Sequence, residues 1–156
     1  MTKKATVLMR VNIVGFAGSP STLFCAFDPN TDMLAIIKEH PEYEAGAREG
    51  FLKISSQSRD EHFDALYAED NTRDAINAFF ELDALKLISI SAKAQRCNPL
   101  NKIERDGMDE GGMKYRIAPD ITNAQVAVLA ASFYAGSQRG AAASMDFMDE
   151  MRMMTF

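Results

Sequence analysis

Residues 120–138, DITNAQVAVLAASFYAGSQ, decide the fold class because they carry the clearest helical pattern in the chain. Thr122 and Gln125 have the spacing of a capping box, in which each side chain accepts from a backbone amide of the other residue. The face of this helix is rich in alanine, so we expect another backbone to approach it closely. Its apolar stripe, at the spacing i, i+3, i+4 and i+7, consists of Val126, Leu129, Ala130 and Phe133.

Period-2 alternation predicts two strands near the N-terminus. Residues 5–14 carry apolar side chains on one face and polar ones, including Arg10 and Asn12, on the other, which predicts a half-buried strand. Residues 22–27, TLFCAF, predict a second strand, and GFAGSPS at 15–21 predicts the turn of a hairpin between them. That turn lacks the lysine and the following helix of a phosphate-binding loop.

The segment 31–85 is predicted to be mostly helical. The caps are Asn30 or Thr31 for the first helix, a Ser58–Glu61 capping box for the third, and Asn71 for the fourth. The first helix takes its apolar stripe from Met33, Leu34, Ile36 and Ile37. The predicted helices cover residues 31–40, 42–55, 58–70 and 71–85.

Period 2 returns in residues 86–94 and 113–119, with a long polar loop at 95–112 between these two strands. Paired strands with helices between and after them predict an α+β fold. We expect a small antiparallel sheet of about four strands, with roughly four or five helices packed on one face and Ala- and Met-rich helices at the C-terminus.

The last part of the chain is expected to form two helices. Gly136 and Gly140 predict a break at residues 135–140, and a terminal helix follows. The expected organisation is a single α+β domain at 1–143 and a Met-rich terminal helix at 144–156, which is either docked on the domain or bound to a partner.

Composition indicates an ordinary globular protein of 156 residues, with 47% apolar residues and enough chain for one core. The net charge of −5 argues against a general nucleic-acid binder, which is usually basic. Two distant cysteines predict reduced thiols. Arg10 and Asn12 interrupt the N-terminal apolar run, so we expect no signal peptide, no transmembrane segment and a cytoplasmic location.

Five of the ten methionines lie in residues 144–156, and on a helix they form a sulfur-rich apolar stripe opposite the charged residues. Three interpretations are open: packing on the protein's own core, docking on a partner, and a soft-metal site of thioethers. No histidine or cysteine assists a metal site, so none is predicted. The expected partner-binding residues are Phe147, Met148, Met151, Met154 and Phe156.

The most basic region of this acidic chain lies at residues 93–116. It is a candidate contact surface for nucleic acid or an acidic protein, although acidic residues are interleaved and the loop has no aromatic residue to stack on bases. The alternative is a solvated loop. The candidate residues are Lys93, Arg96, Lys102, Arg105, Lys114 and Arg116.

Catalytic candidates are few. His62 and its acidic neighbours do not share a helix face, and His40 is expected to contact the C-terminus of a helix. Cys25 is expected to be buried and inert, whereas Cys97 lies beside Arg96 and is the single nucleophile worth testing. We therefore predict no catalytic, cofactor-binding or metal-binding residues.

These patterns favour a non-enzymatic interaction or assembly protein, structural or accessory, that self-associates or docks into a larger complex. A virus-encoded protein fits this description. The first alternative is a charge-mediated binder or inhibitor that uses residues 93–116, and the second is an enzyme with an unrecognised site.

Overall fold

Alternating apolar residues in the first forty positions build three adjoining strands, β1 (Val7–Ile13), β2 (Ser21–Asp28) and β3 (Met33–Glu39). In the computed structural model, which describes residues 4–57 and 63–154 and the side chains of 4–57 and 63–139, these strands form an antiparallel meander. Met9 pairs with Cys25 across β1 and β2. The predicted hairpin at 5–27 is thus confirmed.

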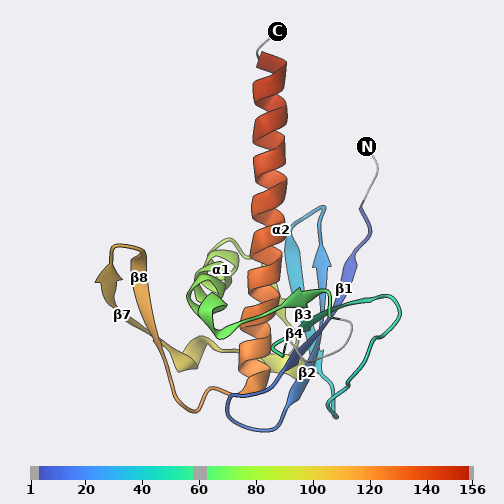
Figure 1. Ribbon diagram of the computed structural model, residues 1–156, viewed down its shortest axis with the longest axis vertical. Helices are drawn as coiled ribbons and strands as arrows, with labels where there is room; N and C mark the ends of the chain where they lie inside the picture. Colours follow the sequence, from blue (N-terminus) through green and yellow to red (C-terminus); the bar gives the residue numbers. More distant parts are fainter. Residues whose placement is uncertain (1–3, 58–62, 155–156) are drawn as a thin grey trace.

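Later segments extend this meander on both sides into a six-stranded sheet in the order β5-β4-β1-β2-β3-β6. The added strands are β4 (Phe51–Ser55), β5 (Ala65–Leu66) and β6 (Ile88–Ile90), and each joins its neighbour in parallel. The sheet is therefore mixed. A separate two-stranded sheet pairs β7 (Ile103–Asp109) with β8 (Gly112–Ile117) and stands away from the main sheet (Figure 1).

The predicted fold class is wrong. The structure has a six-stranded mixed sheet and a two-stranded sheet, and its described residues contain two α-helices, α1 (Thr72–Ala84) and α2 (Asn123–Met154). Short 3₁₀ turns cover Glu69–Asn71, Ala92–Cys97 and Leu100–Lys102. The helix predicted at 71–85 is confirmed as α1, although Asn71 makes no side-chain capping bond to it.

The segment 31–55 differs most from its helical prediction because short apolar runs fit a helix and a strand equally well. In β3, Leu34 and Ile36 are buried and the ladder to β2 satisfies the backbone. Asp32 has a φ of 61°, and the chain turns back along β2 at this point. The sequence instead predicts the start of a helix here. Gly46 and Gly50, with φ of 82° and 83°, keep the following segment irregular until β4 begins.

Two further predictions also fail. Within the predicted helix at 58–70, residues 58–62 with the Ser58–Glu61 capping box lie outside the described residues, and the rest forms β5 and a 3₁₀ turn. The predicted loop at 95–112 is mostly ordered as 3₁₀ turns and β7. Sequence reasoning missed β7 because charged residues and Gly107 conceal its strand pattern.

The long helix α2 begins as predicted. The side-chain oxygen of Thr122 accepts from the amide of Gln125 at 3.2 Å, and the side chain of Gln125 accepts from the amide of Thr122 at 3.0 Å, which confirms the capping box. Residues 123–132 are all buried. They run across one face of the sheet, against β1, β2 and β3, with α1 beside them (Figure 1).

The predicted break at 135–140 is wrong, because α2 is one helix of 32 residues. A Cβ atom added at Gly136 would lie 3.1 Å from the Cβ atom of Ala78 in α1. Gly136 therefore lies at a close contact between the two helices, and its lack of a side chain permits that contact. The glycine that suggested a stop signal has a packing role within a continuous helix.

Asn123, the first residue of α2, holds the turn between β1 and β2. Its side-chain oxygen accepts from the amide of Phe16 at 2.9 Å. Its side-chain nitrogen lies 3.1–3.5 Å from the carbonyl oxygens of residues 16–19, to which it donates. Because this side chain is 1% exposed, these bonds replace the water that a buried amide would lose.

The opposite face of the sheet carries buried polar side chains and lies under the segment 40–50. Arg10 and Asn12 are each 1% exposed, so the prediction that β1 is half-buried is wrong. Arg10 donates to the Glu44 carboxylate at 2.5 Å and to the carbonyl oxygen of Gly46. The Asn12 side chain donates to the Glu44 carbonyl oxygen at 2.8 Å and accepts from the Thr22 hydroxyl at 3.0 Å. A buried polar network thus attaches the segment 40–50 to β1 and β2.

Replacing Asn123 by Asp tests whether the hydrogen bonds of its side chain fix the turn between β1 and β2. The aspartate carboxylate has nearly the same shape and can still accept from the backbone amide of Phe16. Its second oxygen, however, faces the carbonyl oxygens of residues 16–19, to which the side-chain nitrogen of Asn123 donates. We expect the free energy of unfolding, measured in urea at neutral pH, to fall by about 2–4 kcal/mol. Asn101→Asp, at an exposed position, is the matched control and should change it by less than about 0.5 kcal/mol. Equal effects of the two substitutions would contradict this role.

The second prediction concerns Glu44 and pH. Burial raises the pKa of this carboxyl group, but the hydrogen bond from Arg10 and the charges of Arg48, Arg10 and His40 outweigh it, so the pKa is lowered. A carboxyl group with a lowered pKa stabilises the folded state above its unfolded pKa, and this contribution is lost as pH falls through its folded pKa.

We therefore expect Glu44→Gln to unfold at lower urea concentration than the wild type at neutral pH, with a difference that shrinks as the solution is acidified towards about pH 3. Glu42→Gln, at an exposed neighbouring position, is the control. A difference that is constant with pH would show that the Glu44 charge does not hold the segment.

Candidate functional site

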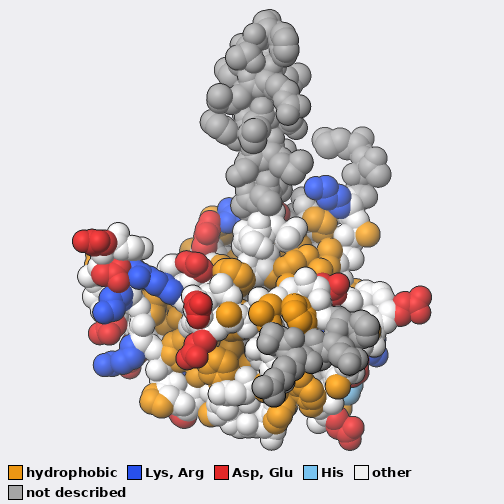
Figure 2. Space-filling model, viewed as in Figure 1, with side chains coloured by type: hydrophobic (Ala, Val, Ile, Leu, Met, Phe, Trp, Pro, Cys, Tyr) orange, Lys and Arg blue, Asp and Glu red, His pale blue; other side chains and the backbone are white. Residues whose placement is uncertain are grey.

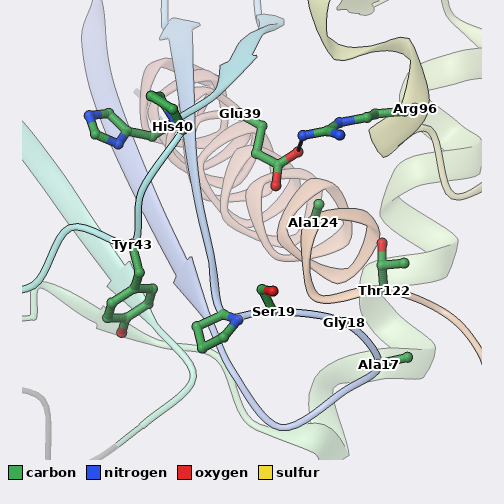
Figure 3. A pocket seen from close by; sticks show the side chains of 11 residues that line it. Ala17, Gly18, Ser19, Glu39, His40, Tyr43, Arg96, Thr122 and Ala124 are labelled. Atoms are coloured by element: carbon green, nitrogen blue, oxygen red, sulfur yellow. Dashed lines mark hydrogen bonds and ion pairs between the residues drawn. The ribbon is translucent and has the colours of Figure 1, made fainter.

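A cavity of about 480 Å³ lies at the start of α2 (Figure 3). Four parts of the chain form its walls: the turn at 17–20, residues 39–43 at and after the end of β3, Arg96 in a 3₁₀ turn, and residues 122–124 at the start of α2. Asn123 holds the turn at 17–20 against α2, so the same hydrogen bonds that fix the fold also shape this cavity. Cavities of this size are common ligand sites.

One wall of the cavity carries an ion pair. Arg96 donates from Nη2 to Oε2 of Glu39 at 2.5 Å, and the Cys97 thiol lies 3.8 Å from the same oxygen. The Arg96 side chain is 77% exposed and that of Glu39 is 21% exposed. Figure 3 shows the two groups meeting above the first turn of α2, with the Glu39 carboxylate directed towards the interior of the cavity.

His40 also borders the cavity, but its ring is engaged elsewhere. Nδ1 lies 2.6 Å from the carbonyl oxygen of Glu42, Nε2 lies 3.5 Å from the Glu44 carboxylate, and the ring packs edge-on against Phe24. The predicted contact with a helix C-terminus is wrong because His40 follows a strand. His62 lies outside the described residues.

Both cysteines are buried as free thiols. Burial, and then the nearby Cys97, raise the pKa of Cys25. Burial and the adjacent Glu39 carboxylate raise the pKa of Cys97 to about 11, although Arg96 acts in the opposite direction. The thiolate is the reactive form, so Cys97 is not positioned as a nucleophile. The sequence placed it in an open loop, whereas it lies at the buried end of a 3₁₀ turn.

The basic residues of the region 93–116 lie in three places. Lys93 and Arg96 lie in the 3₁₀ turn Ala92–Cys97, where Arg96 borders the cavity, and Lys102 ends the turn Leu100–Lys102. Arg105, Lys114 and Arg116 lie on the β7–β8 hairpin. Figure 2 shows positive and negative side chains side by side over this hairpin. Arg116 pairs with Glu104, and Lys102 pairs with Asp120 at 2.7 Å. Acidic partners thus offset much of the positive charge that the sequence suggested.

The hairpin is attached to α1 by one arginine. Arg73 donates from its two terminal nitrogens to the two carboxylate oxygens of Asp109, at 3.0 and 2.7 Å, and from Nε to the carbonyl oxygen of Met113 at 3.2 Å. Phe80 also packs against Tyr115 with ring centroids 5.4 Å apart. Met108, at 74% exposed, stands near the tip of the hairpin.

The side chains of the predicted partner-binding residues, Phe147, Met148, Met151, Met154 and Phe156, lie outside the described residues. The backbone of α2 is helical through Met154, so the first four share a helix with the core residues 123–139.

Sequence reasoning did not bring the residues of the cavity together. Glu39 fell in a predicted helix and Arg96 in a predicted loop, and they are 57 positions apart. The ion pair forms because β3, which ends at Glu39, lies parallel to β6. The chain continues from β6 directly into the 3₁₀ turn that carries Arg96. Nothing in the local sequence around either residue signals it.

Among the described residues, no three or more His, Cys, Asp or Glu side chains are grouped so that they could hold a metal ion. Neither α-helix, over the part of the chain that the structure describes, is both long and apolar enough to span a bilayer. Comparisons of the chain with protein-family models, curated proteins and solved structures find no significant match.

Proposed function

We propose that this chain is a non-enzymatic assembly protein that self-associates through the C-terminal half of α2. The observation that carries the proposal is the length and continuity of this helix. Its 32 residues span about 48 Å at about 1.5 Å per residue. Figure 1 shows its C-terminal part rising beyond the sheet and α1.

The position of the helix supports a partner more than packing on the protein's own core. Residues 123–132 lie within the domain and bury every side chain, and by residues 137–138 the helix is exposed. Arg139 still pairs with Asp32 and with Glu81 of α1. The more distal part of the helix rises beyond the sheet and α1 (Figure 1). An apolar stripe on a helix that has left its domain gains burial chiefly from another chain.

The sequence of the distal segment favours a second copy of this chain as the partner. Ser144, Phe147, Met151 and Met154 are separated by alternating steps of three and four residues. This is the spacing of the positions that face each other in coiled coils, where like stripes on two or more helices interlock. Methionine is flexible enough to fill the gaps in such an interface. Self-association through this stripe would be symmetric.

Deletion of residues 144–156 provides the test. We expect the mass in solution, measured by light scattering, to fall to that of the monomer, while the melting temperature of the domain at low protein concentration stays within a few degrees. The reason is that, among the residues whose side chains the structure describes, those of α2 in the hydrophobic core lie between Ala124 and Ala135. Loss of the fold would instead support packing on the protein's own core, and an unchanged mass would reject self-association through this segment.

Point variants sharpen the comparison without shortening the helix. Phe147→Ser and Met151→Ser remove apolar surface from the proposed interface, whereas Asp149→Ser changes the same helix on its charged side. Dissociation caused by the first two but not by the third supports the proposal. If all three substitutions cause the same dissociation, the cause is a loss of helix stability, and the proposed interface is wrong.

The second candidate function is binding of nucleic acid or an acidic protein through the region 93–116. It is favoured by one observation: among the described residues, Lys93, Arg105 and Lys114 are exposed and form no ion pair. We expect any such binding to weaken steeply as salt rises from about 50 to 200 mM, and Arg105→Ala with Lys114→Ala to reduce that dependence. Glu110→Ala is a control of opposite charge. Binding that is indifferent to salt would exclude this candidate.

A further inference from the structure

We propose that the cavity at the start of α2 binds a small zwitterion of the α-amino-acid type through Arg96 and Glu39. The cavity volume of about 480 Å³ falls within the range of ligand pockets, about 300–1,000 Å³. Its walls come from four separate parts of the chain, so the fold brings the polar groups together before any ligand arrives. The inference does not depend on self-association through α2.

The charge pattern of the cavity identifies the ligand class. Arg96 and Glu39 place opposite charges side by side on one wall, with 2.5 Å between Nη2 and Oε2. A ligand with a single charge is attracted by one of these groups and repelled by the other. A ligand with a carboxylate and an ammonium group on the same carbon complements both groups at once.

Both charged groups keep hydrogen-bonding capacity for such a ligand. Arg96 uses Nη2 in its bond to Glu39, which leaves the N–H groups on Nη1 and Nε for a carboxylate. The Oε2 atom of Glu39 accepts from Arg96 and Cys97, while its Oε1 atom accepts no hydrogen bond from the described residues. Oε1 is therefore the acceptor for an ammonium group.

The remaining walls suggest where the rest of the ligand lies. Pro20, Pro41 and Tyr43 border the cavity, and Figure 3 shows Tyr43 on the far side from Arg96. Proline and tyrosine rings offer apolar surface to a hydrophobic side chain, and the volume exceeds what a charged head group alone requires. An amino acid with an aromatic side chain is thus the appropriate probe.

The test uses the full chain and three related probes at constant ionic strength. L-phenylalanine carries both charges, 3-phenylpropanoate lacks the ammonium group, and phenethylamine lacks the carboxylate. Amide NMR spectra are recorded during each titration. We expect L-phenylalanine to bind with a Kd below about 1 mM and to shift the amides of residues 17–19, Glu39 and Arg96, and the two analogues to bind at least about tenfold more weakly.

Matched variants show whether the ion pair is responsible. Arg96→Ala and Glu39→Gln should each weaken binding of L-phenylalanine by about tenfold or more. Arg139→Ala and Glu81→Gln break another Arg–Glu pair, with 2.7 Å between Nη1 and Oε1, that joins α2 to α1 away from the cavity, and they should leave binding unchanged. Because the Arg96 side chain is 77% exposed, its replacement is expected to leave the fold intact, which circular dichroism checks.

Three results would overturn the proposal. The first is the absence of amide shifts near the cavity at about 10 mM L-phenylalanine. The second is equal binding of the singly charged analogues, which would indicate an apolar or purely ionic contact. The third is a loss of affinity in Arg139→Ala as large as that in Arg96→Ala, which would reflect net charge and not this cavity.

Discussion

The burial of residues 123–132 of α2 on all sides is the constraint on which the rest of the structure depends. A helix that passes between a sheet and a second helix can present only small side chains where its neighbours are closest. Ala127, Ala130 and Ala131 meet this requirement, and Gly136 allows a close contact with α1. Larger residues at these positions would push α1 away from the sheet, and the core would lose its second layer.

Two polar attachments then determine where the irregular segments lie. Asn123 fixes the turn at 16–19 to the start of α2, and the Arg10–Glu44 pair fixes the segment 40–50 to the opposite face of the sheet. Both depend on buried groups that need partners, because an unpaired polar group in the interior is costly. The turn at 17–20 and the start of the segment 40–50 both line the cavity, so these attachments help to shape its walls.

The two ends of α2 suggest separate tasks. The N-terminal end lies within the domain beside the cavity, and the C-terminal end rises beyond the sheet (Figure 1). One continuous helix joins the two ends. Assembly at one end and ligand binding at the other are therefore compatible within one chain.

The sequence by itself determined the elements whose signals are local: the β1–β2 hairpin, α1, β8 and the capped start of α2. Their periodicity and capping residues act within a few positions of one another. Only the tertiary structure decided that 33–39 and 51–55 are strands, that Gly136 continues a helix, and that Glu39 meets Arg96. Each of these outcomes depends on a partner distant in sequence, whose packing and hydrogen bonds override an ambiguous local preference.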